Sequence, residues 1–341
     1  MRNYIYPLML FMVFACESKK EIKPFTSVGI QTIYEDSLNF RAIELMDNSL
    51  AFATNKGTFG NIDLSTKQVR ANRIKQDSIF PEFRAVAHTA TDFFMLSIAS
   101  PALLYKTGDN GMELVYREDG EHVFYDAMAF WNDMEGIAVG DAVDGCLSII
   151  ITRDGGHTWN KLPCSELPEG SSSEGAFAAS NTNIKTVGDK VWIATTSSSI
   201  YFSADKGKTW EHFTTPIVKE KPTQGIYSID FYDEHLGIAI GGDYTVPEGN
   251  NANKAMTEDG GRSWTLIANG SEPDYKSCVQ FVPNYGGNAI VAVGLTGISY
   301  SSDRGKSWSK IADASFYTLR FANDSIAYAA GKNRIAMLTF K

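Results

Sequence analysis

Seven short segments of the chain each carry a charged or hydroxyl-bearing residue at the same place, near the start of an alternating apolar pattern. These residues are Arg41, Arg84, Asp126, Glu174, Tyr227, Ser277 and Tyr317. Arginine guanidinium groups hold carboxylates through paired hydrogen bonds, and two carboxylates such as Asp126 and Glu174 are the pair used in glycoside hydrolysis. The set indicates a binding site for an anionic or sugar ligand, a hydrolytic site, or a solvated ring of mutually neutralising charges.

Other kinds of chemistry are not indicated. The five histidines show no HxxxH or HxH spacing and the four cysteines show no metal-ligand spacing, so no metal site is predicted. No GxGxxG follows a strand pattern and no CxxC is present, which leaves no signature of a cofactor or of oxidoreductase chemistry. The net charge of −9 argues against a nucleic-acid partner.

A repeated eight-residue motif predicts the elements that position these residues. The pattern Ser/Thr-x-Asp-x-Gly-x-Ser/Thr-Trp occurs at 152–159, 203–210, 257–264 and 301–308, with decayed copies at 107–114 and 54–57. Successive copies lie 44 to 54 residues apart, which matches one four-stranded propeller blade. We predict hairpin turns in which Asp accepts turn N–H groups, Gly supplies a special backbone conformation and Trp packs beneath. The residues in these structural roles are Asp154, Gly156, Trp159, Asp205, Gly207, Trp210, Asp259, Gly261, Trp264, Asp303, Gly305 and Trp308.

The motif resembles the Asp-box (BNR) repeat of sialidases, sortilin-type receptors and related propellers. In those proteins Asp boxes stiffen the blades and lie away from the substrate face, so the resemblance implies a fold and not a catalytic site. A sialidase also needs three arginines for its substrate carboxylate, and here only Arg41 and Arg84 stand at ring positions. Arg320 follows its ring position by three residues, so we expect it to point to the other face of its strand.

Longer segments are similar to a group of bacterial exported propellers related to the photosystem II stability/assembly factor family. These segments are 124–131, 136–145, 174–180, 237–244 and 331–338. The resemblance covers nearly the whole mature chain and implies a non-enzymatic binding or assembly role. Some of those relatives are labelled oxidoreductases, which no motif in this chain supports, and a photosynthetic role is not implied.

The strand patterns predict seven blades. First strands begin near Phe40, Phe83, Tyr125, Gly175, Tyr227, Ser277 and Tyr317, and small-residue second strands follow them. The last unit lacks a fourth strand, which residues 28–34 can supply, closing the ring and removing free edges. We therefore predict an all-β fold over residues 27–341, a seven-bladed β-propeller of four-stranded antiparallel blades with Asp-box turns. Second strands return to the mouth where first strands begin, which adds Asp141, Asp144, Asp243 and Tyr244 to the ring.

The N-terminus carries an export signal. Arg2 precedes an apolar run of 12 residues from Tyr4 to Ala15, which is too short to span a membrane. The run ends in Val-Phe-Ala-Cys and resembles the lipobox of bacterial lipoproteins, in which the cysteine is acylated. The sequence predicts a signal peptide over 1–15, lipidation of Cys16, a solvated tether over 16–26 and an exported lipoprotein anchored in the outer membrane. An ordinary secretory signal with an incidental cysteine is the alternative.

Export also permits a disulfide. If the turn at 152–159 is symmetric about Gly155, Ile150 faces Asn160 and Cys146 faces Cys164, within bonding range. The alternative is two free half-buried thiols. Cys278 lies inside a predicted first strand and is expected to be a buried free thiol.

Two classes of function stay open at this point. One is a non-enzymatic, cofactor-free monomer at the cell envelope, attached to the membrane only through its lipid anchor, which holds a protein or glycan partner at the channel mouth. Its candidate ligand-binding residues are Arg41, Arg84, Asp126, Asp141, Glu174, Tyr227 and Asp243. The other is a glycoside hydrolase that uses carboxylates at that mouth.

Overall fold

The computed structural model describes residues 24–171 and 173–341. The predicted signal peptide and Cys16 lie outside the described residues. Among the residues described, no helix is long and apolar enough to cross a membrane.

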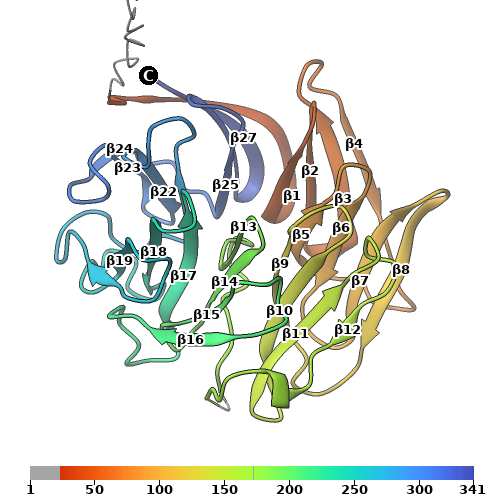
Figure 1. The fold of residues 1–341 in the computed structure, drawn as a ribbon. Coiled ribbons are helices and arrows are strands. Elements are labelled where there is room, and N and C mark those ends of the chain that lie inside the picture. Colours follow the sequence, from red (N-terminus) through yellow and green to blue (C-terminus); the bar gives the residue numbers. More distant parts are fainter. Residues whose placement is uncertain (1–23, 172) are drawn as a thin grey trace, which may run out of the picture.

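The chain forms a ring of β-sheets, which Figure 1 shows face-on. Blades 1 and 2 consist of β1 (Val28–Met46, second half), β2 (Ser49–Thr54), β3 (Thr58–Asp63), β4 (Val69–Arg73), β5 (Phe83–His88), β6 (Phe93–Ser97), β7 (Ala102–Gly108) and β8 (Gly111–Glu118). Blades 3 and 4 consist of β9 (Tyr125–Phe130), β10 (Gly136–Val143), β11 (Cys146–Thr152), β12 (Asn160–Lys161), β13 (Ile184–Val187), β14 (Lys190–Ala194), β15 (Ser199–Ser203) and β16 (Glu211–Thr214).

The remaining three blades follow the same order. Their strands are β17 (Gln224–Phe231), β18 (Gly237–Asp243), β19 (Lys254–Thr257), β20 (Thr265–Leu266), β21 (Cys278–Phe281), β22 (Ile290–Gly294), β23 (Gly297–Ser301), β24 (Ser309–Ala312), β25 (Thr318–Phe321), β26 (Ile326–Ala330) and β27 (Lys332–Phe340). Two short 3-10 helices, η1 (Asn55–Gly57) and η2 (Cys164–Glu166), lie in connections.

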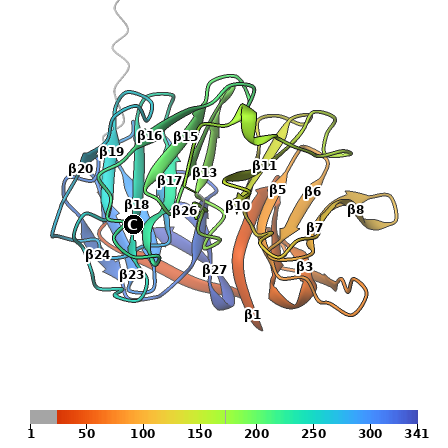
Figure 2. The same ribbon diagram turned by 90° about the horizontal axis from the view of Figure 1, so that it is seen from below.

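The ring closes through β1, which belongs to two blades. Its first half pairs antiparallel with β27, from Val28 opposite Phe340 to Glu35 opposite Arg334. Its second half, from Phe40 to Met46, pairs with β2. In Figure 2 this strand runs along the ring from beside the C-terminus to blade 1. The all-β seven-bladed propeller and its closing strand are therefore confirmed.

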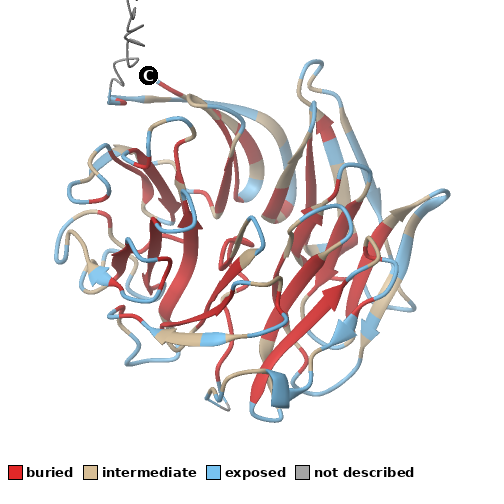
Figure 3. Cartoon of the chain, viewed as in Figure 1, coloured by how far each residue is buried: buried red, intermediate tan, exposed pale blue. Residues whose placement is uncertain are grey.

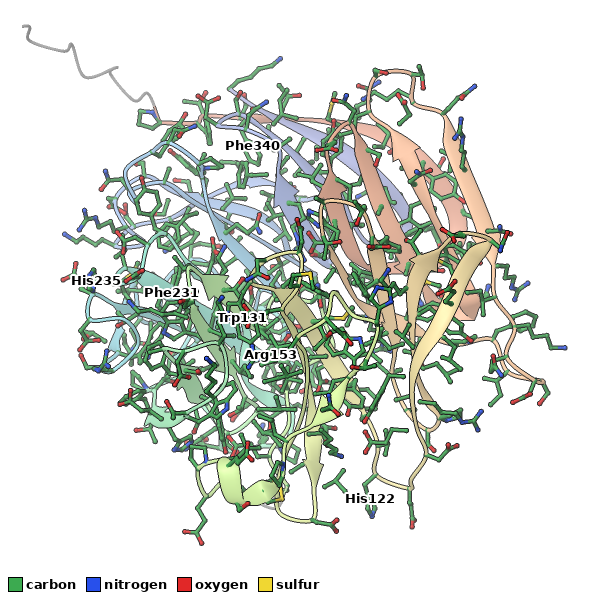
Figure 4. All side chains as sticks on the ribbon, turned by 45° about the vertical axis from the view of Figure 1, so that its right-hand side comes forward. His122, Trp131, Arg153, Phe231, His235 and Phe340 are labelled. Carbon is green, nitrogen blue, oxygen red and sulfur yellow. A yellow bond between two sulfur atoms is a disulfide. The ribbon has the colours of Figure 1, made fainter. Side chains whose placement is uncertain are left out.

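The ordered fold begins earlier than the sequence suggests. Phe25 is buried against Tyr300 and Phe340, with ring centroids 4.9 and 5.1 Å away. The backbone N–H of Thr26 donates to Lys341 O at 2.7 Å. Figure 4 labels Phe340 at this outer edge of blade 7. The last residues of the predicted tether therefore belong to the propeller.

The core lies between neighbouring blades. Second and third strands such as β22 and β15 are buried along their whole length, because the facing blades cover both sides of each sheet. Trp192 on β14 stacks on Phe231 of the next blade with centroids 3.9 Å apart. Figure 3 shows the consequence, buried inner strands and exposed outer strands and turns.

The four complete Asp boxes share one hydrogen-bond pattern. In blade 3, Asp154 accepts the N–H and hydroxyl of Thr158 at 2.9 and 2.7 Å, and Trp159 Nε1 donates to Gly156 O. Gly156 has a φ of 78°, the left-handed region that favours glycine. Because these turns follow third strands, they lie on the face opposite to the starts of the first strands, which we call the Asp-box face.

One predicted strand is wrong. Residues 175–180 form no strand, and the first strand of blade 4 is β13, Ile184–Val187. Residues 175–183, which we call the plug, instead cross the central channel, and Figure 3 shows buried coil beside β13 in the middle of the ring. Small apolar residues gave a strand-like pattern here because the channel buries them as a sheet would.

The plug, which belongs to blade 4, forms hydrogen bonds with the first-strand region of each of the six remaining blades. Asn181 Nδ2 donates to Val86 O at 2.7 Å, and Asn181 Oδ1 accepts the Met128 N–H at 2.9 Å. The remaining bonds reach blades 5, 6, 7 and 1 through Ser228, Ser277, Thr318 and Arg41. Backbone groups that first strands turn toward the channel thus find partners in the plug.

A disulfide joins Cys146 to Cys164, the pair that the sequence singles out, with their Cα atoms 5.6 Å apart. The register used to predict it is off by one residue, since Ile150 pairs with Lys161 and not with Asn160. The strand β12 ends at Lys161, and Cys164 begins η2. Cys278 is free and buried.

Candidate functional site

A cavity of about 270 Å³ opens where the first strands begin. We call it the arginine mouth. Of the seven predicted ring positions, five line it: Arg41, Arg84, Tyr227, Ser277 and Tyr317. The plug supplies the floor, through Phe177, Ala178 and Ala179, and Tyr244, Tyr275 and Leu295 complete the wall.

Of the two arginines in this cavity, Arg41 is the one whose positive charge is not balanced by an ion pair with a described residue. Its Nη1 donates to Ala179 O at 3.2 Å, and its guanidinium lies 4.2 Å from the centroid of the Tyr317 ring. Within the described part of the chain no carboxylate forms an ion pair with it. Burial, and then the positive charge of Arg84, lower the pKa of Arg41. An arriving anion would relieve both effects.

Arg84 is held in place by its neighbours. Its Nε donates to Glu82 Oε1 at 2.8 Å and its Nη2 lies 2.6 Å from the same oxygen. Its Nη1 reaches Ala178 O at 3.4 Å. The plug carbonyls therefore orient both guanidinium groups toward one cavity.

Aromatic rings form the rest of the mouth. Phe177 stacks on Tyr227 with centroids 3.7 Å apart, and Tyr275 meets Tyr227 edge-on at 4.8 Å. Burial raises the pKa of Tyr227, whose hydroxyl donates to Thr223 O at 2.8 Å. At the rim, Tyr244 is 49% and Leu295 45% exposed. The cavity thus combines a cation that lacks an ion pair among the described residues with aromatic and apolar contact area.

Asp126 and Asp141 lie outside this cavity. Asp126 is fully buried, and although no hydrogen bond of normal length reaches its oxygens within the described chain, the Asp141 carboxyl and the Ala176 N–H lie beside them. Burial, and then the charge of Asp141, raise the pKa of Asp126 well above its usual range. Asp141 accepts the Ala176 N–H at 3.2 Å, and burial raises its pKa as well.

Glu174 and Asp243 are engaged in holding loops. Glu174 is buried and accepts the hydroxyls of Thr195 and Tyr201 at 2.5 and 3.0 Å. Asp243 accepts the N–H and hydroxyl of Thr245 at 3.0 and 2.6 Å, and these bonds lower the pKa of Asp243. Glu174 does not occupy the first-strand position expected for it, because that segment belongs to the plug connection. Asp126 and Glu174 do not face each other across an open site.

Arg320 lies at the opposite end of the channel. Its Nε and Nη2 both donate to Glu44 Oε1 at 3.1 Å, and Nη2 also reaches Asn181 O at 3.4 Å. The sequence predicts that Arg320 points to the other face of its strand from Tyr317, and Thr318 and Arg320 do share one side of β25. Arg320 nevertheless reaches the plug in the channel, through Asn181 O. The arginine mouth still contains only two arginines.

Sequence reasoning missed the plug residues and the loop residues Tyr275 and Leu295. Among the aromatic residues of the mouth that lie outside the strands, the sequence predicts Tyr244 and Tyr317. No three His, Cys, Asp or Glu side chains of residues 24–171 and 173–341 gather as a possible metal site.

Comparisons with known proteins agree with this architecture. Residues 147–283, less than half of the chain, match a family model described as Sortilin, neurotensin receptor 3. No curated protein matches the chain. The fold is therefore supported by a partial family match, and no family membership follows.

Solved structures are similar over nearly the whole chain. The structure described as YCF48 bound to D1 peptide has a TM-score of 0.65 at 12% identity and covers 94% of this chain and 98% of its own. The WD40 repeats of RRP9 have a TM-score of 0.67 at 9% identity, covering 94% and 100%. The WD40 propeller domain of Doa1 has a TM-score of 0.60 at 12% identity, covering 91% and 97%. Identities this low establish a shared propeller fold alone.

Proposed function

We propose that this chain is a non-enzymatic binding propeller that holds a protein partner at the arginine mouth through an acidic group of that partner. The observation that carries the proposal is Arg41, a partly buried guanidinium that pairs with no carboxylate of the described residues and lies on the Tyr317 ring beside a second arginine. A carboxylate placed there would form charge-assisted hydrogen bonds with both guanidinium groups.

The surroundings favour a polypeptide ligand. The exposed Tyr244 and Leu295 offer apolar contact beside the cation, so an acidic group next to an apolar side chain fits the mouth. One protein of similar fold is described as bound to a peptide, which supports this use of the architecture. A hydrolytic role is supported less, since Glu174 is engaged by Thr195 and Tyr201.

The location of this activity is part of the proposal. The apolar run, Cys16 and the charged stretch after it support an exported lipoprotein at the outer membrane. A lipid anchor at Cys16 would join the propeller close to Phe25, at the outer edge of blade 7. The partner would then be a protein of the cell envelope.

Peptide and glycan arrays test the proposal. The probes are peptides with acidic side chains or free C-terminal carboxylates, together with neutral and acidic glycans, and the mature wild-type protein is compared with R41A/R84A. The matched control is R70A/R262A, which removes two exposed arginines elsewhere. We expect carboxylate-bearing peptides to bind wild type and the control, and to lose at least about tenfold in affinity with R41A/R84A.

Two outcomes would overturn this function. If R41A/R84A binds the peptides with wild-type affinity, the arginine mouth is not the binding site. Turnover of chromogenic glycosides that D126N abolishes would replace binding by hydrolysis. Melting curves of each variant show whether the propeller is intact.

A further inference from the structure

A second, larger depression adjoins the arginine mouth. It is an open groove of about 1300 Å³ over the loops of blades 2 to 5. Its lining includes Arg84, Phe177 and Ala178, which also line the mouth. Figure 4 labels His122, another residue of this groove. The two depressions therefore adjoin at Arg84, Phe177 and Ala178, and we call them together the trough.

The trough has opposite charges in its two parts. The mouth holds Arg41, a cation that forms no ion pair with a carboxylate of residues 24–171 or 173–341. The groove holds Asp141, whose carboxylate accepts one backbone N–H and forms no ion pair with any described residue. Directly behind it lies Asp126, a fully buried carboxyl that lies against Asp141 and whose pKa burial raises well above its usual range. Asp126 therefore favours its protonated form, and its contact with Asp141 favours the negative charge of this wall on Asp141.

The remaining charges of the groove do not neutralise this wall. Glu121, Asp144 and Glu220 add acidic groups. Arg84 also lines the groove and its charge lowers the pKa of Asp126, but its guanidinium is paired with Glu82. Lys219 and Lys221 line the groove too, and both are exposed. Neither lysine forms an ion pair with Asp141 in the described chain. A cation supplied by a ligand would complete the site at Asp141.

We infer that the bound segment is a dipolar, extended polypeptide that sets its acidic group on Arg41 and a Lys or Arg side chain on Asp141. The inference rests on the proposed function and adds the charge order of the ligand. Because the mouth and the groove meet only along Arg84 and the plug, a ligand that reaches both must be elongated. Complementary charge at both ends would also fix the direction in which the segment lies.

The test uses acetylated glycine–serine peptides that end in leucine with a free carboxylate. One series carries Lys at two to six residues before the carboxylate, and a matched series carries Ala. Affinities are measured by microscale thermophoresis for the mature wild-type protein, D141N, R41A/R84A and D47N. Asn at 141 retains an oxygen for the Ala176 N–H, and D47N removes one exposed acidic charge on the Asp-box face.

For at least one spacing we expect the Lys peptide to bind wild type about tenfold more tightly than its Ala counterpart. D141N should erase this gain while it leaves the Ala peptide within about twofold, and D47N should keep the gain. R41A/R84A should weaken both series.

The outcomes separate the two proposals. The dipolar ligand is overturned if Lys raises the affinity at no spacing, or if D141N keeps the affinity gain from Lys. This holds even where R41A/R84A still weakens binding of the Ala series. Ala peptides that bind wild type and R41A/R84A equally, or that do not bind at all, contradict the acidic group at the mouth and the dipolar ligand with it.

Discussion

Two buried titratable groups stand out at the residue scale. Arg41 is a partly buried cation that forms no ion pair with a described carboxylate, and Asp126 is a fully buried carboxyl whose raised pKa favours its protonated form. Stability alone would not favour either, since well-packed apolar residues usually cost less than a buried charge or a buried carboxyl. Both lie near the mouth where the first strands begin. Titratable groups with shifted pKa values that gather at one face are typical of a functional surface.

The raised pKa of Asp126 predicts that the free energy of unfolding depends on pH. Its pKa is raised in the folded state, so the folded protein binds the proton more tightly than the unfolded chain does. The stability that Asp126 contributes is therefore full below the unfolded pKa and is lost as the pH rises through the folded pKa. D126N removes this loss, and we expect it to raise the free energy of unfolding at pH 7.5 by at least about 1 kcal/mol.

Urea unfolding at two pH values measures this effect. The gain from D126N should shrink toward zero near pH 4, where the unfolded carboxyl also begins to hold its proton. D47N, at an exposed carboxylate, should show neither the gain nor its pH dependence. A D126N variant less stable than wild type at pH 7.5 would show that Asp126 is ionised and paired in solution.

The plug is the decisive feature at the scale of elements. It fills the channel, forms the floor of the mouth and orients Arg41 and Arg84 through the carbonyls of Ala179 and Ala178. Asn181 fastens it by pairing with Val86 O and the Met128 N–H, both buried. Truncating this side chain leaves two buried backbone groups without partners.

We expect N181A to lower the free energy of unfolding by about 2–3 kcal/mol. It should also weaken ligand binding at the mouth, because the floor that orients the guanidinium groups loosens. N61A, at an exposed asparagine on β3, is the control for stability. Denaturant curves and peptide affinities of both variants provide the measurement. An N181A protein as stable as N61A would show that the plug does not stabilise the fold through Asn181.

The elements also show how far sequence reasoning reaches. The Asp boxes and the alternating strands repeat every blade, so they predict the propeller and its closing strand β1 correctly. The plug occurs once, and its small residues at 175–180 imitate a strand because channel and sheet bury them alike. Arg41, Arg84 and Tyr227 could be placed at one mouth by counting along strands. Tyr275, Leu295 and the plug carbonyls could not, because loops carry no repeat from which to count.

The closure of the ring governs the molecule as a whole. The first half of β1 covers the outer edge of β27, and Phe25 packs against Phe340 beside it. Without this segment β27 would present unpaired backbone groups to solvent, which promotes aggregation. We expect deletion of residues 17–35 to lower the Tm by on the order of 10 °C or more.

Deletion of residues 17–23 alone is the matched control, since it leaves Phe25 and β1 in place. Differential scanning fluorimetry compares the two proteins. Equal melting temperatures would contradict closure by the N-terminal strand.

Photo-crosslinking in cells tests directly whether a partner docks at the arginine mouth, as we propose. A photoreactive amino acid replaces Leu295, 45% exposed at the mouth, or Met134, 54% exposed on the Asp-box face, in the full-length protein. We expect a discrete crosslinked protein from position 295 and none from position 134. R41A/R84A should abolish this adduct, and R70A/R262A should retain it. The same adduct from position 134, or an adduct from position 295 that R41A/R84A leaves unchanged, would contradict docking at the arginine mouth.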